Sequence, residues 1–94
     1  MYSNAERGFF RTKIPIAYIF GDYPVSRSEA RRLATSITNL EEVYLDFSNV
    51  SDIGQAFTHE LFVVFQGSNP NIKLNVMNAN DDVSAMINRV INTK

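Results

Sequence analysis

The chain of 94 residues contains no cysteine. Disulfides, thiolate metal ligands and cysteine nucleophiles are therefore excluded, and because a reducing compartment suits such a chain, we predict a cytoplasmic protein. No apolar run approaches the roughly 20 residues that a membrane-spanning helix needs. The first ten residues, MYSNAERGFF, lack the basic-then-apolar order of a secretory signal. We therefore predict no association with a membrane.

Positive charge is missing from the middle of the chain. No Lys or Arg lies between Leu33 and Ile72, a stretch that holds five acidic residues: Glu41, Glu42, Asp46, Asp52 and Glu60. The formal net charge of −1 predicts no affinity for nucleic acid. We interpret the uneven distribution either as a docking surface for a partner of mixed charge or as two ordinary solvated faces.

Signatures of catalysis are also missing. The four glycines do not have the spacing of a phosphate-binding loop. The single histidine, His59, has no second histidine four residues later, as a zinc-protease helix requires. Without a nucleophile–base pair, a metal-ligand set or a cofactor fingerprint, we predict a protein that is not an enzyme and holds no metal or cofactor.

Apolar residues make up 45% of the chain and are arranged in alternating patterns. Strands are predicted over residues 13–20 (KIPIAYIF), 43–47 and 72–76, and helices over 27–37, 57–65 and 81–91. The first and last helices have one apolar stripe, whereas the middle helix is apolar around most of its circumference and is expected to pack on two sides. This order predicts an α/β fold: one small domain with a mixed, mostly parallel sheet of about four strands and three helices packed against it. Residues 1–12 would be an N-terminal extension or an edge strand, and residues 13–94 the domain.

Several helix starts have recognisable capping residues. Ser26 and Glu29 form a capping box, Asp52 and Gln55 have the same spacing, and Asn80 is placed to cap the last helix. Asp46, at the end of the central strand, is expected to orient the following loop by accepting backbone N–H bonds rather than to act as a general base.

The run from Val25 to Val90 resembles the STAS-like domains, a small bacterial group related to anti-sigma-factor antagonists, most specifically in LDFSNVSDIGQAF followed by HELFVVF. The resemblance implies a mixed sheet with helices and a regulatory, protein-binding role. In the STAS family proper the corresponding loop carries an Asp-Ser-Ser-Gly type motif, whose serine is phosphorylated by a histidine-kinase-like ATPase. Here Gly54, Gln55, Ala56 and Phe57 occupy those positions, so the phosphoserine switch is not carried over.

The predicted partner-facing edge is the loop and helix start at residues 51–59, because a strand that leads into a helix presents backbone N–H groups there. We expect a protein partner, either a histidine-kinase-like ATPase or a regulator. Its predicted contacts are Ser51, Asp52, Gly54, Gln55, Thr58 and His59, with Arg27 and Arg31 on the flanking helix.

Alternatives remain for several of these residues. Gln55 either forms hydrogen bonds with the partner or only completes the helix cap with Asp52. His59 is expected to be an ordinary surface histidine. Arg27 and Arg31 either bind an anion or form a solvated face. Ser51 and Thr58 are phosphorylation candidates by position alone. The domain would otherwise sense a small ligand or nucleotide through the helix N-terminal backbone amides. Pairing of the strand that contains Pro15 with a second copy would give a homodimer.

Overall fold

The computed structural model describes residues 11–92. Its sheet has three parallel strands, β1 (Arg11–Pro15), β2 (Glu42–Asp46) and β3 (Lys73–Met77), in the order β1-β2-β3. The α/β class is confirmed, whereas the expected sheet of about four strands has three in the described part of the chain. Arg11 and Thr12 belong to β1, and the rest of the predicted N-terminal strand falls on residues 1–10, outside the described residues.

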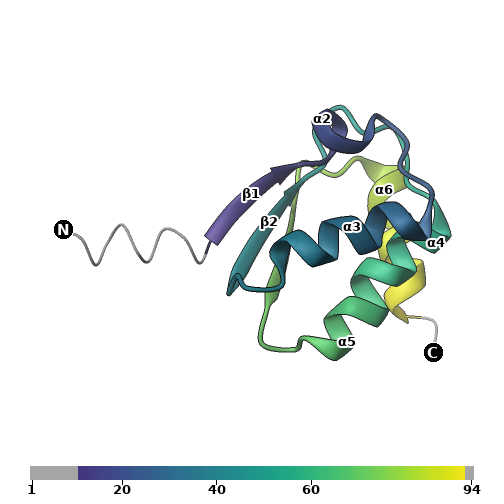
Figure 1. Cartoon of the computed structure of the whole chain (residues 1–94). Coiled ribbons are helices and arrows are strands. Elements are labelled where there is room, and N and C mark those ends of the chain that lie inside the picture. The colour runs from purple at the N-terminus through teal and green to yellow at the C-terminus, as the bar shows by residue number, and fades with distance from the viewer. Residues whose placement is uncertain (1–10, 93–94) are drawn as a thin grey trace.

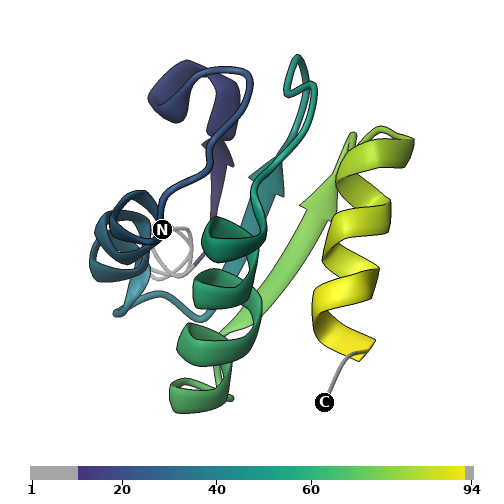
Figure 2. The same ribbon diagram turned by 90° about the vertical axis from the view of Figure 1, so that its right-hand side faces the viewer.

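Three helical segments cover one face of the sheet (Figures 1 and 2). They are α3 (Arg27–Ile37), a continuous helix made of α4 (Gln55–His59), η1 (Glu60–Phe65) and α5 (Gln66–Ser68), and α6 (Asp81–Asn92). Right-handed crossovers between neighbouring parallel strands explain the placement of α3 and the central helix, because in the order β1-β2-β3 each crossover leaves its helix on the same side. Helix α6 follows β3 and packs against the central helix.

The central strand separates a buried face from a polar one. Val43 and Leu45 point to the helices and are fully buried, whereas Glu42, Tyr44 and Asp46 lie half-buried on the opposite face. Burial of the alternate residues on the helix side supplies most of the hydrophobic free energy that holds the layers together. The core also includes Ile16, Leu33, Ile37, Phe47, Ile53, Phe57, Leu61 and Val83.

The predicted strand over residues 13–20 is wrong in its second half. The strand ends at Pro15, and Ile16–Phe20 forms the short helix α2. A run that is apolar on both faces has no period that distinguishes strand from helix, and Pro15 has no N–H with which to continue a ladder. Gly21 ends the helix at φ 87°, a conformation that glycine adopts without strain, and donates its N–H to the Ala17 carbonyl at 2.9 Å.

Two of the three predicted helix caps are confirmed and one is wrong. The Ser26–Glu29 box is confirmed, with the Glu29 N–H 3.1 Å from Ser26 Oγ and the Ser26 N–H 3.2 Å from Glu29 Oε1. Asn80 caps α6 by accepting the Val83 N–H at 2.8 Å. The Asp52–Gln55 box is wrong, because Gly54 is the N-cap of α4 and Asp52 Oδ1 instead accepts the N–H of its neighbour Ile53.

A π-helical turn interrupts the central helix at η1. A π turn holds more residues than an α turn, so it rotates the residues that follow it relative to an α-helical stripe. Phe57, Leu61 and Phe65 are buried as expected, but Val64, predicted on the same stripe, is 42% exposed. Glu60, three residues after Phe57 and so on the same side of the helix, is also buried. Within residues 11–92, no helix has the length and apolar character needed to cross a membrane.

Candidate partner-binding surface

The loop before α4 is held by hydrogen bonds to the segment that follows α2. The Asp22 carbonyl accepts the Ser51 N–H at 2.8 Å and the Ser51 hydroxyl at 3.1 Å, and the Pro24 carbonyl accepts the Gly54 N–H at 2.8 Å. The Asp52 N–H lies 3.4 Å from the same Asp22 oxygen. The backbone amides of Ser51, Asp52 and Gly54 are therefore engaged within the chain.

Gly54 allows this closure because it has no side chain. A Cβ atom at this position would lie 2.8 Å from the Cα atom of Val25, closer than non-bonded carbon atoms approach. The backbone φ of Gly54 is −80°, so the requirement is for space and not for an unusual conformation. Gly54 therefore contributes to the packing of the loop rather than to an exposed contact surface.

The two hydroxyl groups near the loop have structural partners. Thr58 is fully buried, and its hydroxyl donates to the Gly54 carbonyl at 2.7 Å. Its predicted place on the contact surface is therefore wrong, since no partner reaches it in this conformation. Ser51 is exposed, but its hydroxyl donates to the Asp22 carbonyl.

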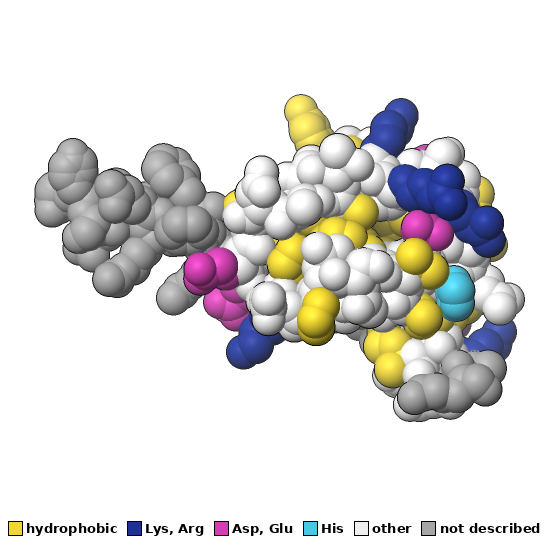
Figure 3. Space-filling model, turned by 60° about the horizontal axis from the view of Figure 1, so that its bottom comes forward, with side chains coloured by type: hydrophobic (Ala, Val, Ile, Leu, Met, Phe, Trp, Pro, Cys, Tyr) yellow, Lys and Arg dark blue, Asp and Glu magenta, His cyan; other side chains and the backbone are white. Residues whose placement is uncertain are grey.

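Three exposed residues of α4 lie beside two hollows in the surface. Gln55, Ala56 and His59 border two adjoining hollows of about 340 Å³ and about 160 Å³. Arg27 of α3 completes the first hollow, and two residues of α6 that the sequence analysis missed, Arg89 and Val90, complete the second. We call these six residues the α4 surface. Figure 3 shows basic side chains, an acidic group and the histidine gathered on this face.

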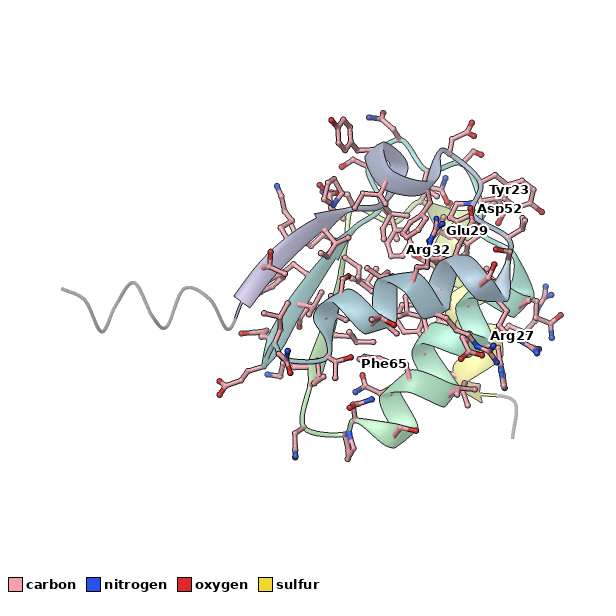
Figure 4. The ribbon with its side chains drawn as sticks, in the orientation of Figure 1. Tyr23, Arg27, Glu29, Arg32, Asp52 and Phe65 are labelled. Carbon is pink, nitrogen blue, oxygen red and sulfur yellow. The ribbon has the colours of Figure 1, made fainter. Side chains whose placement is uncertain are left out.

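The flanking arginines are oriented by a carboxylate of the same chain. The Nε atoms of Arg27 and Arg31 lie 3.6 and 3.4 Å from the two carboxylate oxygens of Glu60, whose side chain is only 11% exposed. Arg27 lies at the end of α3 nearest the start of α4 (Figure 4). No sequence signal indicated this pairing, because Arg31 and Glu60 lie 29 positions apart.

Asp46 behaves as the sequence analysis predicted. Its Oδ1 atom accepts the Ser48 N–H at 3.0 Å, the Ser48 hydroxyl at 2.7 Å and the Asn78 amide at 3.0 Å. The hydrogen bonds from Asn78 and then Ser48, with a smaller contribution from Lys13 3.9 Å from Oδ2, lower the pKa of Asp46 from 3.8 to about 2. A carboxylate so stabilised is a weak base, and its role is to tie the residues that follow β2 and β3 together.

No group of three His, Cys, Asp or Glu side chains that could hold a metal ion occurs among residues 11–92. A further hollow, of about 390 Å³, lies near the start of β2 and β3 and is bordered by Glu41, Glu42, Asn71 and Lys73. These residues include none that the sequence analysis assigned to partner binding.

The parallel sheet, its single helical layer and the exposed start of the helix after β2 define a small α/β domain of the STAS-like class. Residues 29–84, more than half of the chain, match the family model described as STAS-like domain of unknown function (DUF4325). The chain belongs to this family, which confirms the resemblance found in the sequence. Comparison with curated proteins and with solved structures gave no match.

Proposed function

We propose that this domain is a non-enzymatic regulatory module that binds a protein partner through the α4 surface. The observation that carries the proposal is that Gln55 and His59 lie between two adjoining hollows, exposed on a helix whose opposite side is fixed in the core. Concave surfaces bordered by a few polar side chains are typical of binding sites.

The charges of the α4 surface support binding rather than catalysis. Arg27 is already held by Glu60, and Gln55 supplies an amide that can both donate and accept a hydrogen bond. Asp46, the one carboxylate that the sequence placed at the end of the central strand, is engaged in structural hydrogen bonds. Family resemblance favours a histidine-kinase-like ATPase or a regulator as the partner.

The alternative, a sensor of small ligands or nucleotides, would have to use the amides at the start of α4, because those of the loop before it are engaged. Three amides of the loop before α4, those of Ser51, Asp52 and Gly54, point at carbonyl oxygens of residues 22 and 24. A phosphate group would have to displace those contacts before it could bind there. The exposed side chains of α4 are therefore a better basis for function than the loop backbone.

The test begins with capture of the partner by the tagged chain in its native host, identification by mass spectrometry, and purification of both proteins. Gln55→Arg adds a large charged group in the α4 surface and should raise the Kd at least tenfold, about 1.4 kcal/mol. Asn39→Arg, a matched control, adds the same charge at the exposed turn after α3 and should leave the Kd unchanged. Equal affinity of the Gln55→Arg variant and the parent would refute the proposed surface.

A further inference from the structure

The two edges of the sheet differ in the hydrogen-bonding groups that they present. In a strand, the N–H and C=O of one residue point to the same side and alternate along the chain. The Lys73 N–H donates to Glu41 O and the Phe47 N–H donates to Met77 O, each at 2.9 Å. Lys73, Asn75 and Met77 therefore face β2, and the backbone groups of Leu74 and Val76 point away from it.

The same reasoning gives the outer groups of β1. Because the odd-numbered residues of β2 face β3, its even-numbered residues face β1, where Tyr44 is paired with Lys13 and so bonds to Thr12 and Ile14. The outward backbone groups of β1 are those of Arg11, Lys13 and Pro15, and Pro15 has no N–H to offer. Proline and lysine on an edge strand discourage pairing with another strand, so β1 is the protected edge.

The β3 edge lacks this protection. Leu74 and Val76 both have an N–H and a C=O that point outward, and no hydrogen bond of the described residues uses them. Val76 is 41% exposed although its side chain lies on the helix side of the sheet, paired with the buried Leu45. An exposed β-branched residue beside free backbone groups is typical of an edge that accepts a further strand.

A hollow lies where the side chains of that strand would go. It has a volume of about 210 Å³ and is bordered by Val76 of β3 and by Ser84, Ile87 and Asn88 of α6. Figure 2 shows α6 displaced outward from β3, beside the position that a fourth strand would occupy. Ile91, one turn after Ile87, is 45% exposed and extends the apolar rim.

We propose that an extended segment of a partner protein pairs with β3 as a fourth strand and places an apolar side chain in this hollow. The backbone of such a strand forms hydrogen bonds with the outward N–H and C=O groups of Leu74 and Val76, and its alternate side chains face α6. A second copy of the chain fits less well. Symmetric pairing of two β3 edges, about 4.8 Å apart, would bring two α6 helices together, although packed helices need about 8–10 Å between axes.

Amide hydrogen exchange of the free, full-length chain tests the first part of the proposal. The amides of Leu74 and Val76 should exchange at least tenfold faster than that of Asn75, whose N–H faces β2. Protection of both amides in dilute solution would show that the chain covers its own edge, and protection that appears only at high concentration would show pairing of two copies. Either result overturns the proposal.

Selection from a random dodecapeptide library on the immobilised chain tests the second part. The selected peptides should alternate apolar and polar residues and, once synthesised, should perturb the amide signals of Val76, Ser84 and Asn88. Val76→Pro removes the outward N–H without removing a bond between β2 and β3, and should raise the peptide Kd about tenfold. Val76→Ala shortens the side chain but keeps the N–H and should bind more tightly than Val76→Pro. Equal binding by the proline variant and the parent, or a library without binders, would overturn the proposal.

Discussion

The Oδ1 atom of Asp46 accepts three hydrogen bonds, and these favour its ionised form. Since the pKa is about 2 in the folded chain against an ordinary value of 3.8, the ionised carboxylate contributes to the stability of the fold. That contribution is fully present well above pH 3.8, decreases as the pH falls through that value, and is lost below about pH 2.

Urea unfolding between pH 6 and pH 2 measures this contribution. The parent chain should lose more stability over the interval than Asp46→Asn, whose amide cannot ionise. The difference between the two proteins should become small toward pH 2, where the parent carboxyl becomes protonated in the folded chain. The same pH dependence in both would contradict the assignment of the low pKa to Asp46.

Gly54 and Gly67 form a matched pair for testing the closure of the loop. Gly54→Ala forces a Cβ against the Val25 backbone and should destabilise the fold by about 1–3 kcal/mol. Gly67→Ala, within the helical segment Gln66–Ser68 and with nothing within 4 Å of the new Cβ, should stabilise it by roughly 0.5–1 kcal/mol. Urea midpoints measure both, and a neutral Gly54→Ala would contradict the contact with residues 22–25.

Helix α3 is joined to the central helix by the ion pairs of Arg27 and Arg31 with Glu60. Because 66% of the Arg31 side chain is exposed, solvent screens the attraction and the pair is worth little. A double-mutant cycle with Arg31→Met and Glu60→Gln should give a coupling free energy of about 0.2–1 kcal/mol that decreases in 1 M salt. A coupling above about 3 kcal/mol that salt does not change would show that the pair is desolvated.

The helices and strands that could be predicted from the sequence are those whose bounds are set by residues close together in the chain. The capping box of Ser26 and Glu29 lies within four residues and predicts the start of α3 correctly. Residues 13–20 are apolar throughout, and only the path of the chain after Pro15 makes the second half helical. The π turn at η1 has no local sequence signal of the kind that marks a helix start, so the exposure of Val64 was not predicted.

The residues of the candidate site could likewise be predicted only where local sequence patterns decide their position. Gln55 and His59 were placed correctly on an exposed helix start, because helical spacing puts them off the apolar stripe of Phe57 and Leu61. The bonds of Ser51 and Gly54 to residues 22 and 24 join segments about thirty positions apart, a distance over which local patterns give no information. Arg89 and Val90 of α6 reach the site by tertiary packing alone.

Across the whole molecule, α6 borders both proposed surfaces. Arg89 and Val90 face the start of α4, and Ser84, Ile87 and Asn88 face the free edge of β3. It packs against the central helix, and its residues Val83, Ile87 and Val90 are buried. One helix thus separates a polar surface built from side chains from an edge built from backbone groups.

Nuclear magnetic resonance of the ¹⁵N-labelled chain, titrated with the purified partner, tests the central claim directly. Binding through the α4 surface predicts that the amide signals of Arg27, Gln55, Ala56 and His59 shift together, whereas the signal of Asn39 stays in place. Shifts confined to the opposite hollow at Glu41, Glu42 and Asn71, with Gln55 and His59 unchanged, would contradict it.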